Sequence, residues 1–198
     1  MKTLNLKSIL AIAIISTCFH AAGYSQWKPK TLNVALVSES ISIPFVQFVP
    51  TAAHPGFAIG TDLWTMDKTS WHQSFGIEAG YFYHRTFEHA VMLDAVYNLG
   101  YTFSFKLRPN FIAAVGYKHS ILSGNTFVLE DGVYVKKTHL GVPQVNFKIG
   151  FGLEYPITDK YRITANYIGS VPVPGINGNP FSLHTLIQIG TKIDLQSN

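Results

Sequence analysis

Hydrophobic and polar residues alternate at every second position over long stretches of the chain. Between Val145 and Tyr155, large apolar residues occupy the odd positions, while Asn, Lys, Gly and Glu occupy the even ones. Because successive side chains of a strand point to opposite faces, this period predicts β-strands and not helices. The same pattern predicts strands over Phe57–Met66, Gln73–His84, Glu88–Lys106, Phe111–Leu122, Val145–Tyr155, Lys160–Gly169 and Phe181–Leu195.

An eighth strand is expected before Phe57, because bacterial barrels have an even number of antiparallel strands and both chain ends on one side. Two segments compete for this place. Thr31–Ser38 has alternating apolar residues, and Ile41–Val49 contains Pro44. Proline cannot donate a hydrogen bond to the ladder of a closed sheet. The pattern therefore favours Thr31–Ser38.

The connections between the predicted strands are alternately short and long. Leu107–Asn110 and Pro156–Lys160 are short, whereas Ser123–Gln144 and Ser170–Pro180 are long. This pattern is typical of membrane barrels, with tight turns at the periplasmic rim and longer loops outside. The chain is thus predicted to be all-β: an eight-stranded antiparallel up-and-down transmembrane β-barrel. An exported soluble barrel that binds an apolar ligand also alternates, and it stays open as an alternative in which the apolar face lines a cavity.

The composition and the amino-terminal residues indicate the class of protein and predict that it is exported. Of the 198 residues only 13% are charged, 47% are hydrophobic and one is Cys, which excludes a disordered chain and a disulfide scaffold. Lys2 and Lys7 precede the apolar run Ile9–Ile15, which is typical of a secretory signal peptide. We predict a cleaved signal peptide over residues 1–25 and a barrel domain over 26–198. Without Lys2 and Lys7, 13 of the 15 basic residues face 11 acidic ones, and this balance does not favour nucleic acid.

Charged residues on the polar face are predicted to point into the barrel. An eight-stranded lumen is wide enough only to be filled by side chains or to hold one small ligand. Charges that cannot reach water must be paired, so the near balance of acids and bases predicts an internal ion-pair network. Its predicted members are Asp62, Glu78, Asp94, Lys106, Lys118, Lys148, Glu154, Arg162 and Lys192.

Three short segments give the chain a family resemblance. They are Gly116-Tyr117-Lys118-His119-Ser120, Gly150 to Tyr155, and His54-Pro55-Gly56-Phe57. In these segments and in its strand pattern, the chain resembles the small bacterial outer-membrane β-barrel proteins of the OmpA membrane-domain and OmpX type. The resemblance implies location in the cell outer membrane, with membrane lipid as the surroundings. It implies no particular activity.

The resemblance also raises the alternative of a lipid-modifying enzyme similar to a lipid A deacylase. Acyl transfer needs a nucleophile, a base and an orienting group on one face. His84 and His184 are the two histidines expected near the outer rim. His119 and Ser120 are adjacent and so point to opposite faces of a strand. The sequence therefore predicts a non-enzymatic barrel with a structural or surface-interaction role, without a cofactor or a recognisable metal motif.

The longest loop, 123–144, contains an Asp131-Gly132 step. This step predicts a hairpin turn whose two flanks extend beyond the bilayer. An uncovered ribbon of this kind offers an edge to a surface partner. The alternative is a solvated hairpin that shields the mouth of the barrel.

Overall fold

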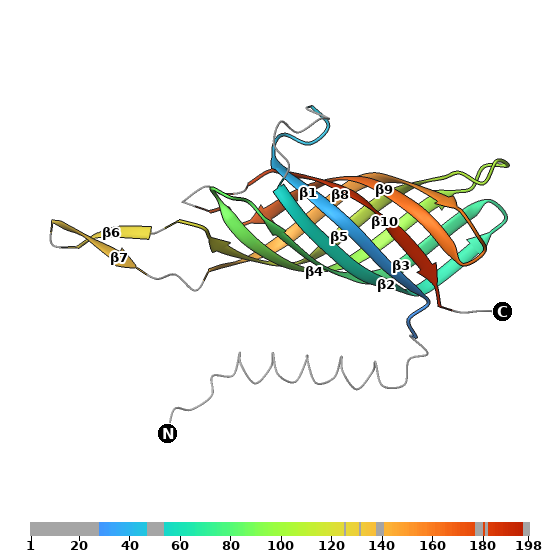
Figure 1. The fold of residues 1–198 in the computed structure, drawn as a ribbon, viewed down its shortest axis with the longest axis horizontal. Coiled ribbons are helices and arrows are strands. Elements are labelled where there is room, and N and C mark those ends of the chain that lie inside the picture. The colour runs from blue at the N-terminus through green and yellow to red at the C-terminus, as the bar shows by residue number, and fades with distance from the viewer. Residues whose placement is uncertain are drawn as a thin grey trace, which may run out of the picture.

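In a computed structural model, residues 28–46, 54–124, 126–130, 132–137, 141–176, 180 and 182–195 are described. The predicted signal peptide, residues 1–25, lies outside them. Within the described residues, eight antiparallel strands close into one barrel in the order β1-β10-β9-β8-β5-β4-β3-β2 (Figure 1). The barrel strands are β1 Thr31–Ile41, β2 His54–Lys68, β3 Trp71–Tyr83, β4 Glu88–Tyr101, β5 Arg108–Leu122, β8 Val142–Pro156, β9 Tyr161–Val173 and β10 His184–Asp194. The described part of the chain has no helix long and apolar enough to cross a membrane.

Strand β8 shows which way the alternating faces point. Its odd positions from Val145 to Tyr155 are 48–58% exposed, whereas Asn146, Lys148 and Glu154 are 0–5% exposed. The apolar side chains therefore cover the outside of the barrel, and the polar ones are enclosed. This orientation is opposite to the one that a soluble ligand-binding barrel would need, in which the apolar face would line a cavity.

A closed barrel with an apolar outer face suits a hydrocarbon environment. Closure pairs the backbone groups of every strand within the sheet, so no unpaired edge faces lipid. Lipid-facing apolar residues that alternate with enclosed polar ones are characteristic of outer-membrane barrels. The prediction of an eight-stranded antiparallel barrel is confirmed, and the apolar outer face agrees with the predicted outer-membrane location.

The amino-terminal strand is the one that the alternation favoured. β1 begins at Thr31 and continues three residues beyond the predicted end at Ser38. It closes the barrel by pairing with β10 on one side and β2 on the other. Among the described residues, the start of β1, the end of β10 and the turns after β2, β4 and β8 lie at one end of the barrel, and the long loops lie at the other (Figure 1).

One predicted turn is misplaced. The predicted strand Glu88–Lys106 ends at Tyr101, and the chain turns over residues 102–107 instead of Leu107–Asn110. Lys106 lies in this turn with a left-handed φ of 69°, and its backbone NH donates to the carbonyl of Phe103. The alternation misleads here because Phe103 and Phe105 continue it into the turn, where their rings stack on each other. Such aromatic residues belong to the membrane interface and not to the strand itself.

The long loop forms the predicted hairpin. Its strands β6 Thr126–Glu130 and β7 Val133–Lys137 pair with each other in a separate two-stranded sheet. Gly132 in the turn has a φ of 80°, a conformation that glycine adopts without strain. The hairpin projects beyond the end of the barrel that carries the longer loops (Figure 1).

Candidate functional site in the barrel interior

The charged side chains inside the barrel form three clusters along its axis. The periplasmic cluster, nearest the tight turns, centres on Glu154. Its Oε1 accepts a hydrogen bond of 2.9 Å from Lys192 Nζ, which also lies 3.2 Å from Asp62 Oδ2. Arg108 Nη1 approaches Glu154 Oε2 to 3.6 Å. Strands β2, β5, β8 and β10 each contribute one of these residues, so the cluster joins opposite walls of the barrel.

The central cluster is built around Lys148 on β8. Its Nζ lies 2.7 Å from Asp94 Oδ2 and 3.4 Å from Glu78 Oε1. Asn146 donates to the other oxygen of Asp94 at 3.2 Å, and Gln188 donates to Glu78 at 3.3 Å. One enclosed ammonium thus lies between two carboxylates, and each carboxylate accepts a further hydrogen bond from a neutral amide.

The outer cluster lies below the long loops and contains two fully buried carboxylates, Glu39 and Glu88. Lys118 Nζ donates to Glu88 Oε1 at 2.6 Å. His184 Nδ1 is 2.7 Å from Glu39 Oε1, and its Nε2 is 3.4 Å from Lys118 Nζ. The Phe82 ring closes one side, with its centroid 5.3 Å from Lys118 Nζ.

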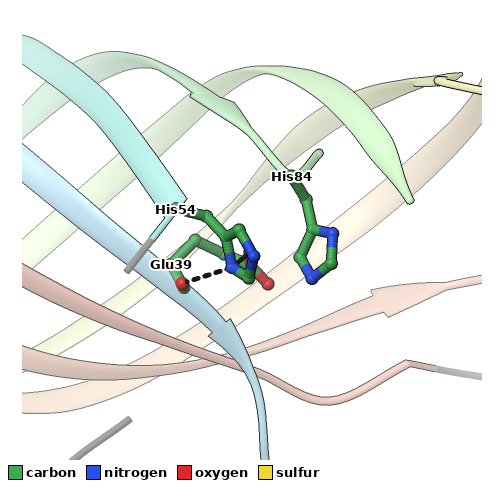
Figure 2. Close-up of side chains that lie close together, drawn as sticks. All are labelled: Glu39, His54 and His84. Carbon is green, nitrogen blue, oxygen red and sulfur yellow. Dashed lines mark hydrogen bonds and ion pairs between the residues drawn. The ribbon is translucent and has the colours of Figure 1, made fainter. Parts of the chain in front are cut away.

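At the rim above this cluster, two histidines lie next to Glu39. The rings of His54 and His84 stack with centroids 3.6 Å apart. His54 Nδ1 is 3.3 Å from Glu39 Oε2 and 3.0 Å from the Glu39 carbonyl oxygen (Figure 2). His84 follows the end of β3, where partial burial lowers its pKa from the usual value of an imidazole and the neighbouring His54 lowers it further. Its imidazole is therefore mainly neutral at neutral pH.

Apolar side chains fill the space between the polar groups. A buried cluster inside the barrel includes Val37, Phe82, Met92, Ile168 and Leu186. A cavity of about 60 Å³ remains beside Lys148 and Glu154, which is room for a few water molecules. The lumen is thus packed with side chains, as expected for eight strands.

Most of the residues predicted for the lumen lie where the face alternation put them. Lys106 is the exception and must be corrected: it is exposed in the turn between β4 and β5, away from the three clusters. The others make the contacts described above or, in the case of Arg162, pair with Asp194 at 2.5 Å. The predicted members found inside the barrel are Asp62, Glu78, Asp94, Lys118, Lys148, Glu154, Arg162 and Lys192.

The two histidines singled out from the sequence have different positions. His184 is only 1% exposed and belongs to the outer cluster, whereas His84 lies in the turn above it. Sequence reasoning missed Glu39, His54 and Glu88. Each has the inward parity of its strand, but Glu39 lay one residue beyond the predicted strand Thr31–Ser38, and His54 lay three residues before the predicted strand Phe57–Met66.

The comparisons with known proteins show a similarity in overall shape only. No protein-family model matches the chain, and no curated protein matches it either. Solved structures of similar shape include Neisserial surface protein A (TM-score 0.48, 11% identity). The match covers 83% of this chain and 95% of the chain of that protein. The outer membrane enzyme PagL (TM-score 0.48, 14% identity) covers 83% and 99%, respectively. Ail, the attachment invasion locus protein of Yersinia pestis (TM-score 0.43, 8% identity), covers 84% and 99%. At these values nothing about activity is carried over to this chain.

Proposed function

We propose that the protein is a non-enzymatic outer-membrane barrel with a structural or surface-interaction role. The observation that supports this proposal most directly is the filled lumen. Three ion-paired clusters and an apolar band occupy the interior, and the cavity among them has about 60 Å³. A diffusion pore needs a continuous aqueous path, which eight strands filled in this way do not provide.

A conductance measurement tests the absence of a pore. The purified barrel is inserted into planar lipid bilayers, with a large trimeric porin as the positive control. We expect no steady conductance above that of the lipid alone, because the ion-paired side chains block the lumen. Stable, reproducible single-channel steps from the correctly folded protein would contradict the proposal.

The proposed surface role rests on the β6–β7 hairpin. This hairpin projects from the outer end of the barrel (Figure 1), and its two strands pair with each other in a sheet of their own. Each strand therefore has a second edge that the other does not cover. Such an edge is a suitable place for a partner strand to add.

The contacts of His184 do not favour the enzymatic alternative. Glu39 orients its Nδ1 as an acid orients a catalytic base, at 2.7 Å. Its Nε2, however, faces Lys118 Nζ at 3.4 Å and Glu88 Oε1 at 3.8 Å, where a base would need a hydroxyl or thiol nucleophile. Moreover, the imidazole is enclosed in the lumen, whereas an acyl chain of a lipid lies outside the barrel.

Lipid A analysis distinguishes the two functions. Lipid A is extracted from cells that overproduce the protein, from cells that overproduce the His184→Ala variant, and from cells with neither. We expect the same lipid A mass in all three, because the enclosed imidazole has no access to lipid. A loss or gain of one acyl chain that requires His184 would establish the enzyme instead.

A further inference from the structure

The outer rim brings three metal-binding residue types together. Glu39 lies near the end of β1, His54 is its direct partner on β2, and His84 follows β3, the next strand of the sheet. One possible ligand atom from each lies within 4.8 Å of the others. Figure 2 shows the two imidazole rings side by side, with the Glu39 carboxylate next to His54.

The imidazole nitrogens are arranged for metal binding. His54 Nδ1 lies 3.0 Å from the Glu39 carbonyl oxygen, which can only accept, so Nδ1 carries the proton and donates. The His54 Nε2 then has its lone pair free for a ligand bond. His84 contacts the Thr86 hydroxyl through Nδ1 at 3.4 Å. A hydrogen bond from one ring nitrogen to a protein oxygen is the usual support for a metal bond at the other.

A buried carboxylate oxygen lies beside these rings without a hydrogen bond. Glu39 is fully buried, and its Oε2 has no hydrogen-bond partner among the described residues. The outer cluster groups two acidic side chains, Glu39 and Glu88, with the single ammonium of Lys118. A cation bound here would give this buried oxygen the partner that it lacks and would lie beside two acidic side chains.

We propose that Glu39, His54 and His84 bind one zinc-type divalent cation at the outer mouth of the barrel. Two imidazole nitrogens and one carboxylate oxygen match the ligand preference of Zn²⁺, while Ca²⁺ and Mg²⁺ prefer oxygen alone. Three protein ligands leave a fourth position for water. This inference concerns a binding site and does not depend on the proposed structural role.

Binding requires the ligand atoms, which lie within 4.8 Å of one another, to move closer together. Zinc bonds of about 2.0–2.2 Å hold tetrahedral ligand atoms roughly 3.5 Å apart. Glu39 and His54 are held by the pairing of β1 with β2, whereas His84 lies just outside β3 and can follow the ion. The bound ion would tie β1 and β2 to the turn between β3 and β4.

Zinc titration of the purified barrel tests this site. The protein is prepared from membranes without a polyhistidine tag, stripped with chelator and titrated with Zn²⁺ in a calorimeter. We expect one Zn²⁺ per barrel, and binding weakened by at least about 10–100-fold in His54→Ala and in His84→Ala, since even supporting residues have effects of this size. His89→Ala is the matched control, because His89 contacts Tyr81 at the same end and should leave binding unchanged.

Cobalt absorption gives a second reading that a merely folded barrel would not provide. Co²⁺ in a four-coordinate site has intense visible bands, and we expect them in the wild type and in His89→Ala but not in Glu39→Gln. Circular dichroism verifies that each variant has its strands. Absence of Zn²⁺ binding to the folded wild type, or equal binding by a folded His54→Ala/His84→Ala double variant, would overturn the proposal.

Discussion

Replacement of Lys148 by Met is expected to lower the free energy of unfolding by about 3–5 kcal/mol, the usual cost of removing one partner from a buried charge pair. Lys148 is 5% exposed and lies between Asp94 and Glu78, at 2.7 and 3.4 Å. Without it, two enclosed carboxylates face each other with no cation in their cluster. The measurement is denaturant unfolding of the barrel in lipid vesicles.

Two further variants make this result interpretable. Lys160→Met removes an exposed lysine from the turn after β8, and we expect a change within about 0.5 kcal/mol. The triple variant Lys148→Met/Asp94→Asn/Glu78→Gln removes the charges together and should recover part of the lost stability. If Lys148→Met behaves like Lys160→Met, the lumen is wet enough to solvate these charges, and the account of a filled interior is wrong.

The second large effect is expected on the opposite face of the same strand. Ile149 lies in the middle of β8, points outward and is 51% exposed. Arginine at the middle of a bilayer destabilises a membrane barrel by about 2–4 kcal/mol, and by about 0–1 kcal/mol near the interface. We therefore expect Ile149→Arg to be strongly destabilising in vesicles. Asp159→Arg, in the exposed turn, should cost little.

The comparison of Ile149→Arg with Asp159→Arg distinguishes a barrel in a membrane from a soluble barrel. In a soluble barrel, an outward arginine at position 149 would be solvated and harmless. If Ile149→Arg and Asp159→Arg have equal stability in vesicles, the face that contains Ile149 does not contact hydrocarbon.

Face alternation predicted the strands and most of the inward charges. It depends on local geometry alone, since every second side chain of a strand points the same way. It placed Lys148 and Glu154 inside and Phe147 and Ile149 outside, as the structure has them. It failed at Lys106, because interface aromatics continued the apolar rhythm beyond the end of β4.

Contacts between distant strands could not be predicted in this way. Lys148 on β8 meets Glu78 on β3 across the lumen, and Lys118 on β5 approaches His184 on β10. Such meetings depend on the stagger and tilt of the closed sheet, which alternation does not contain. The rim cluster was missed for a related reason: Glu39 and His54 belong to strand ends, whose positions are the least certain part of a sequence-based assignment.

The orientation of the apolar face is tested most directly by the accessibility of attached labels. Because Cys18 is the single cysteine and lies in the predicted signal peptide, a nitroxide can be attached at one introduced cysteine at a time, replacing Phe147, Ile149, Ile189 or Asp159. In vesicles, we expect the first three labels to collide with dissolved oxygen and not with a water-soluble nickel complex, and the label at position 159 to do the reverse. Nickel access at positions 147, 149 and 189 equal to that at 159 would contradict the account of a barrel with its apolar face in lipid.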